Sequence, residues 1–205
     1  MPTSISIGQN KTIDTSNWGM ADSASWQNRG FGASRARYSK SAKKAEAVVT
    51  GIVASPSNDA KAAVGHEIEL QDSPSDSDDL EITVDGDYKT FVRLVGETSG
   101  TLRIGVFVKR PEQKMTTTGV IDYAPIVNRE KSFEDQVTLE NTFSELAYLN
   151  GSMMEAGDVF QIGVYVLTEI SAVGYASSVV DAFGKTESPS GDEYVGFDSI
   201  NLTWD

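Results

Sequence analysis

Cysteine is absent from this 205-residue sequence, and histidine occurs once, at His66. The lack of cysteine excludes disulfides, a thiolate nucleophile and cysteine-ligated zinc or iron–sulfur sites. One histidine leaves little material for a histidine-ligated metal site, although it would be enough for a Ser-His-Asp triad. We therefore expect no cofactor and no enzymatic activity, and we assign His66 a structural or surface role.

Long apolar runs are also missing. No run approaches the roughly 20 residues that a membrane-spanning helix needs. Residues 1–19 do not show the basic stretch followed by an apolar stretch that is typical of a secretory signal. We expect a protein made and folded inside a cell, and its apolar fraction of 39% predicts a folded core.

Charge is unevenly distributed along the chain. Residues 1–45 carry seven Lys or Arg and two Asp, a net charge of +5. The other 160 residues carry 10 Lys or Arg and 28 Asp or Glu, a net charge of -18, which gives -13 in total. So acidic a surface stays soluble in strong salt, and we hypothesise a salt-loving source, with an ordinary acidic protein as the alternative.

Residues 1–45 are predicted to form an arm rather than a packed layer. They are rich in Ser, Gly, Asn and Ala and show no sustained apolar period. Large aromatic residues within such a stretch are typical of a segment that becomes ordered against a partner. The predicted interface residues of the arm are Trp18, Trp26, Arg29, Phe31, Arg35, Arg37, Tyr38, Lys40, Lys43 and Lys44.

The basic arm has several possible targets. Nucleic acid phosphates and an anionic membrane surface would both attract it. A neighbouring copy of the same protein would also do so, and a disordered solubilising tail is the remaining interpretation. We favour the neighbouring copy because a +5 arm and a -18 body are complementary between copies.

The rest of the chain shows period-2 or buried-strand patterns, separated by turn signals such as "DGD" and "NGS". The expected strands are 46–54, 66–71, 80–84, 88–95, 101–109, 136–140, 158–170 and 194–204. The residues expected to face the core are Leu102, Ile104, Val106, Val108, Phe160, Ile162, Val164 and Val166. A short helix is expected near 141–149, where Phe143, Leu146 and Leu149 would share a helical face.

Together these patterns predict an all-β fold with little helix. About eight strands indicate two face-to-face antiparallel sheets or a closed barrel over residues 46–205, with residues 1–45 as an extended N-terminal arm. "RIGVFVK" (103–109) and "QIGVYVL" (161–167) share one core pattern, which we interpret as two strands in equivalent positions rather than an internal duplication.

Two weaker site candidates remain. The aspartates between Asp72 and Asp87 offer oxygen ligands to calcium but lack the EF-hand order, so a solvated acidic loop is favoured. Trp18, Trp26 and Trp204 could stack on sugars, but they are widely separated, which favours packing roles.

The segments "NGSMMEAGDVFQIGVYVLTE" and "YVGFDSINLTW" resemble the closing strands of a single jelly roll, in which a Gly-Asp turn, here Gly157-Asp158, introduces a long apolar strand. With the arm, the acidic body and the missing cysteine, the chain is similar to the small single-jelly-roll coat proteins of halophilic archaeal viruses with an internal membrane. That resemblance implies a β-barrel that assembles into capsomers and has no catalytic residues.

We therefore expect a virion structural protein, assembled in the host cytoplasm and located in the virion. Its partners would be copies of itself and other coat proteins, with the arm touching neighbours or the layer beneath. The alternative is a spike or tail-fibre-like β-sandwich module that binds a receptor or a glycan. An enzyme of the cupin type is disfavoured because cupins usually need several histidine ligands.

Overall fold

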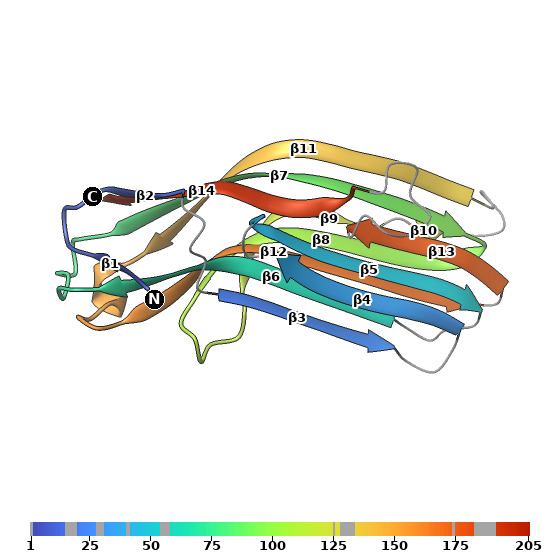
Figure 1. Cartoon of the computed structure of the whole chain (residues 1–205), viewed down its shortest axis with the longest axis horizontal. Coiled ribbons are helices and arrows are strands. Elements are labelled where there is room, and N and C mark those ends of the chain that lie inside the picture. Colours follow the sequence, from blue (N-terminus) through green and yellow to red (C-terminus); the bar gives the residue numbers. More distant parts are fainter. Residues whose placement is uncertain are drawn as a thin grey trace.

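The computed structural model shows a sandwich of two β-sheets, with the amino and carboxyl termini at the same end of an elongated molecule (Figure 1). The structure describes residues 2–14, 20–27, 31–39, 42–53, 58–124, 126–127, 134–173, 175–182 and 192–205. The all-β class and the sandwich form are as predicted. In place of about eight strands, the described residues form seven in each sheet.

Each sheet combines strands from distant parts of the sequence. Sheet A contains β1 (Thr3–Ile5), β3 (Met20–Gln27), β6 (Asn58–Leu70), β8 (Glu97–Lys109), β9 (Thr117–Tyr123), β10 (Ile126–Val127) and β12 (Val159–Val173). Sheet B contains β2 (Lys11–Ile13), β4 (Phe31–Ser39), β5 (Lys44–Val53), β7 (Leu80–Val95), β11 (Glu134–Leu149), β13 (Tyr175–Ala182) and β14 (Tyr194–Trp204). A 3-10 turn, η1 (Gly151–Met153), precedes β12. No helix in the described ranges is long and apolar enough to cross a membrane.

The antiparallel ladders are nested, as in a long hairpin folded back over itself. β8 pairs with β9, β7 with β11, and β6 with β12. β5 pairs with both β13 and β14. The same two strands also pair with successive parts of β7. Two layers result, β6-β12-β8-β9 and β5-β14-β7-β11, and this folded-over hairpin in two sheets is the jelly-roll arrangement.

The inner faces of the sheets form one hydrophobic core, because alternate residues of each strand point inward. Ile104, Ile162 and Val164 are completely buried there. Seven of the eight predicted core residues are buried, and Val108 packs against the same cluster from a partly buried position. The predicted face assignment is therefore confirmed.

The repeated sequence pattern has a direct structural reason. β8 and β12 are antiparallel neighbours, and their ladder places Gly105 opposite Tyr165 and Phe107 opposite Gly163. Each aromatic side chain thus lies across from a glycine of the other strand, which leaves room for the ring. A Cβ on Gly163 would lie 2.1 Å from the Val64 carbonyl oxygen of β6, so this position admits only glycine.

Two local predictions are wrong. "DGD" is not a turn, because β7 continues through it as one 16-residue strand. Gly86 serves close packing there, since a Cβ would lie 2.4 Å from the Gly196 carbonyl oxygen. The helix expected near 141–149 is part of β11, whose side chains alternate between half-buried positions such as Phe143 and exposed ones such as Leu146.

The prediction that residues 1–45 stay outside the packed layers is also wrong for their described strands. β1 and β3 pair with β6, β2 pairs with β14, and β4 forms a hairpin ladder with β5. β5 begins at Lys44, so the expected boundary between residues 45 and 46 falls inside a strand. The missing apolar period misled the prediction because edge strands need only a half-buried face.

The Gly-Asp turn was correctly predicted to introduce a long apolar strand. Gly157 has φ +88°, a left-handed conformation that favours glycine. The Asp158 carboxylate accepts hydrogen bonds from the Glu155 backbone N–H (2.8 Å) and from Arg110 (2.6 Å). β12 begins at the next residue, Val159, so the turn fixes where this central strand starts.

Candidate functional site

The described part of the predicted arm interface lies on strands at one side of the sandwich. Trp18, Arg29 and Lys40 lie outside the described residues. Trp26 belongs to β3 and Phe31 and Arg35 belong to β4, but their side chains are also outside the described part. Tyr38 is 43% exposed. The assignment of these ten residues to an interface between copies stays a prediction.

Three cations of the basic stretch have partners within the same chain. Arg37 forms an ion pair with Glu46, a buried carboxylate on the neighbouring strand β5. The Lys43 ammonium donates a hydrogen bond to the Asp198 carbonyl oxygen at 2.7 Å. The Lys44 ammonium lies 3.3 Å from the centre of the Tyr194 ring. Part of the positive charge is thus used to join β4 and β5 to β14.

The Tyr194 ring is held in place by a carboxylate. Its hydroxyl donates a hydrogen bond to Asp87 on β7. Burial, together with this hydrogen bond and the negative charge of Asp87, raises the pKa of Tyr194 above its usual value. The hydroxyl therefore remains protonated near neutral pH, and the ring is kept in position beneath Lys44.

The opposite edge of sheet B is formed by β11. Sixteen consecutive residues of β11 pair with β7 without a bulge, and among the described strands β7 is its only ladder partner. The strand contains no Lys, Arg or Pro, which commonly block an edge, and its only charged residues are four carboxylates. Leu146 is 41% exposed and Tyr148 is 58% exposed on its outer face.

Side-chain contacts show which backbone groups of β11 point outward. Thr90 of β7 donates its hydroxyl to the Leu139 carbonyl oxygen (3.4 Å), so Leu139 faces β7. The Thr142 N–H instead donates a hydrogen bond to the Asn141 side-chain oxygen at 2.9 Å. Because residues alternate along an antiparallel ladder, the even-numbered residues direct their N–H and C=O groups to the open edge. Sequence reasoning predicted a strand only over 136–140 and a helix after it, so it missed this long edge, although the alternation of polar residues continues to 144.

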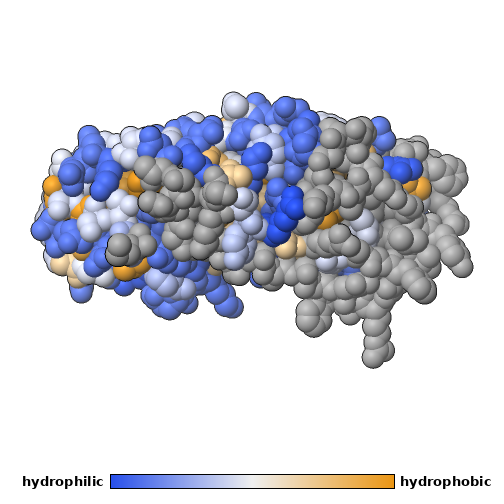
Figure 2. Space-filling model, viewed as in Figure 1, coloured by the Kyte–Doolittle hydropathy of each residue, from blue (hydrophilic) through white to orange (hydrophobic). Residues whose placement is uncertain are grey.

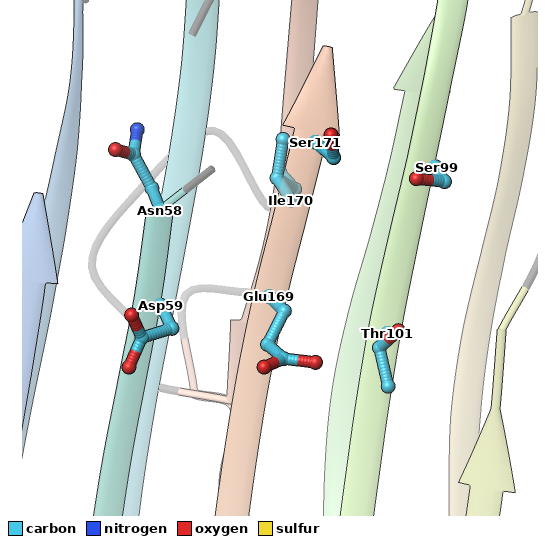
Figure 3. A pocket seen from close by; sticks show the side chains of 7 residues that line it. All are labelled: Asn58, Asp59, Ser99, Thr101, Glu169, Ile170 and Ser171. Atoms are coloured by element: carbon cyan, nitrogen blue, oxygen red, sulfur yellow. The ribbon is translucent and has the colours of Figure 1, made fainter. Parts of the chain in front are cut away.

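A cleft of about 270 Å³ lies on the outer face of sheet A. We call it the polar cleft; Asn58, Asp59, Ser99, Thr101, Glu169, Ile170 and Ser171 line it. Figure 3 shows Asp59, Glu169 and Thr101 on neighbouring strands, with Ser171 and Ser99 one step further along. The sequence analysis did not identify it, because its residues come from three separate strands, β6, β8 and β12.

Three of the remaining candidates of the sequence analysis have hydrogen-bond partners within the chain. His66 is buried, and its Nε2 lies 2.6 Å from the Thr3 hydroxyl of β1. Asp78 accepts two hydrogen bonds from Ser75, which lower its pKa, and Asp79 accepts one from the Gly151 N–H. Within the described residues, no group of three or more His, Cys, Asp or Glu is placed to hold a metal ion.

Comparison with known proteins leaves the family open. No family model and no curated protein matches the chain. Among solved structures, the glycoside hydrolase domain of Endo-D from Streptococcus pneumoniae R6 matches at 12% identity and a TM-score of 0.24, over 91% of this chain and 21% of that chain. A carbohydrate-binding module, TmCBM61 in complex with beta-1,4-galactotriose, matches at 12% identity and a TM-score of 0.21, over 89% and 91%. At these values neither structure carries an argument about function.

Proposed function

We propose that this chain is a structural subunit, a coat protein of a virion, that associates with copies of itself through the open edge of β11. The observation that carries the proposal is the length of that edge without a bulge, a proline or a basic residue. Unpaired N–H and C=O groups in such a row are a template for pairing with another strand. The jelly-roll arrangement agrees with the resemblance to small coat proteins.

The sequence of β11 suits pairing with a second copy about a twofold axis. In an antiparallel pair centred on Thr142, the Asn141 side chain releases the Thr142 N–H, and the two Thr142 residues exchange their outward-pointing N–H and C=O groups. Glu140 then faces the partner's Ser144, and Glu145 faces the partner's Leu139. No carboxylate faces another carboxylate along residues 136–148, so the self-pairing avoids direct charge repulsion.

The described surface also favours a backbone ladder over an apolar contact. Figure 2 shows one face of the molecule, on which hydrophilic residues cover most of the described surface and hydrophobic residues form small separate patches. Scattered apolar residues of this kind are normal on a soluble surface. The ladder supplies one contact of a coat lattice, and the predicted arm interface would supply another.

The net charge of -13 makes the salt dependence of association a test. We expect the sedimentation-derived mass to increase between about 0.15 M and about 1 M salt, because screening reduces the repulsion between like-charged copies. An assembly held mainly by a basic arm on an acidic neighbour would instead weaken with salt. A mass that falls with salt would therefore contradict the β11 contact.

A proline at the centre of the edge tests the contact itself. Thr142→Pro removes an outward N–H that β7 does not use, so association should weaken roughly tenfold to a hundredfold. Thr142→Ala is the matched control, since it removes the hydroxyl and keeps the N–H. Ser144→Pro repeats the test at the next outward position if Thr142→Pro fails to fold. Proline variants that associate like the parent protein would overturn the proposal.

A further inference from the structure

The polar cleft is built from cross-strand rows on the outer face of sheet A. Asp59 of β6 lies opposite Glu169 of β12, which in turn lies opposite Thr101 of β8. Ser171 lies opposite Ser99 in the next row. Two carboxylates and three hydroxyls therefore line one cleft, with Glu169 in the middle of its row between Asp59 and Thr101 (Figure 3).

Four of these side chains have no hydrogen-bond or ion-pair partner among the described residues, namely those of Asp59, Glu169, Ser99 and Thr101. Elsewhere on the same face such groups are paired: Gln161 donates to Glu67 at 2.9 Å, and Arg103 contacts Asp122 at 3.1 Å. The cleft thus holds hydrogen-bonding capacity that the described residues do not use.

Asn58 also borders the cleft, but its side chain points toward sheet B, on the opposite face of β6 from Asp59. It is completely buried, and its amide nitrogen donates to the Thr50 carbonyl oxygen of β5 at 3.1 Å. Its Oδ1 has no hydrogen-bond partner among the described residues. This acceptor lies between the two sheets and is not among the groups that the cleft offers to a ligand.

An apolar strip continues from the cleft along β12. Leu167 and Tyr165 are half-buried and follow Glu169 at two-residue intervals, so all three lie on one face. Burial raises the pKa of Tyr165, Arg103 lowers it, and the charges of Glu169 and Asp59 raise it further, so the phenol shares the electrostatic environment of the cleft. Lys61 and Arg103 flank Leu167 on the neighbouring strands and supply donors.

We propose that the polar cleft binds a neutral oligosaccharide. One sugar ring would donate its hydroxyls to Asp59 and Glu169 and accept from Thr101, and the next would lie over Leu167 and Tyr165. Sugars combine hydroxyl edges with apolar C–H faces, which matches a cleft of carboxylates and hydroxyls beside an apolar strip. This binding activity is separate from association through β11, which lies in the other sheet.

The test is calorimetric titration of the full chain with uncharged three-unit oligosaccharides of glucose, galactose and mannose. We expect at least one to bind, and Glu169→Gln and Asp59→Asn each to weaken that binding about tenfold to a hundredfold, because hydrogen bonds to charged groups are the stronger ones. Glu67→Gln is the matched control on the same face, where Gln161 already occupies the carboxylate. It should bind like the parent protein.

Three outcomes would overturn the proposal. One is that none of the oligosaccharides binds. Another is binding that persists in an Asp59→Asn, Glu169→Gln double variant whose circular dichroism matches the parent. The third is that calcium binds to the parent protein while the sugars do not, and that Asp59→Asn and Glu169→Gln abolish the binding of calcium. Sedimentation of the same variants keeps the two proposals distinguishable, because association through β11 should be unchanged in all of them.

Discussion

Sheet B ends in two edges that differ in their chemistry. β4, at one edge, carries Arg35 and Arg37 and lies beside β3 of the other sheet (Figure 1). β11, at the other edge, carries four carboxylates but no basic residue and no proline, and its outward backbone groups pair with no strand among the described residues. Charged residues on an edge, lysine above all, are a common protection against unwanted pairing. β4 is thus protected by its cations and by its contact with β3, whereas β11 is protected only by carboxylates, whose repulsion salt screens.

The protected edge is also tied to its own molecule. Arg37 reaches Glu46 on β5, while Lys43 and Lys44 reach the backbone and the tyrosine ring of β14. These contacts give part of the reason why an acidic protein concentrates its cations near the amino terminus. Arg37, Lys43 and Lys44 contact groups of their own chain. For the other cations of the basic stretch, contact with a neighbouring copy stays a prediction.

The largest expected loss of stability follows from a substitution in the hydrophobic core, which lies between the two sheets. Ile162 is completely buried at the centre of β12. Ile162→Ala should lower the free energy of unfolding by about 2–5 kcal/mol, and the milder control Ile162→Val by about 0.5–1.5 kcal/mol. Chemical denaturation measures both. An unchanged midpoint for Ile162→Ala would mean that this face of β12 does not pack against sheet B.

The next effect should be confined to the protected edge. Arg37→Ala leaves the buried Glu46 carboxylate without its ion-pair partner, so we expect a loss of about 1–3 kcal/mol in unfolding free energy. Arg103→Ala is the matched control, because both members of its pair with Asp122 are about half exposed and such pairs contribute about 0–1 kcal/mol. Equal losses in the two variants would show that Arg37 does not tie β4 to β5.

The smallest effect on stability is expected at the open edge. Tyr148 is 58% exposed, so Tyr148→Ala should change the unfolding free energy by no more than about 0.5 kcal/mol. Association measured by sedimentation should nevertheless weaken, since the side chain would face the partner's Gln136 across the twofold axis. Thr203→Ala, on the outer face of β14, is the control and should leave association unchanged. A large loss of stability in Tyr148→Ala would show that this side chain belongs to the fold.

Sequence reasoning succeeded where period-2 patterns were strong. The alternation in 101–109 and 158–170 correctly identified the central strands β8 and β12 and their buried faces. Sequence reasoning failed where the role of a residue depends on a contact with a residue far away in the sequence. Gly86 looks like a turn residue, and only its contact with Gly196 and Phe143 shows why glycine stands inside a strand.

The two candidate sites were harder to foresee for the same reason. In β11, Phe143, Leu146 and Leu149 match helical spacing as well as they match a strand, and the 16-residue ladder with β7 decides between them. The polar cleft depends on a register that places Asp59 beside Glu169, 110 positions later in the sequence. The arm also illustrates this limit: a chain starting at Glu46 would lose β1 to β4, so truncation removes paired strands of the sandwich.

The nested ladders also bear on how the chain is made. The ladder between β8 and β9 closes within a short stretch, whereas β5 must wait for β13 and β14 to be synthesised before it is enclosed. While the chain is being synthesised, β5 therefore lacks these partners, and folding dominated by such distant pairings is slow. During that interval the acidic charge of the later strands would keep nascent copies apart, so the same charge that limits association at low salt would protect the chain from aggregating before it has folded.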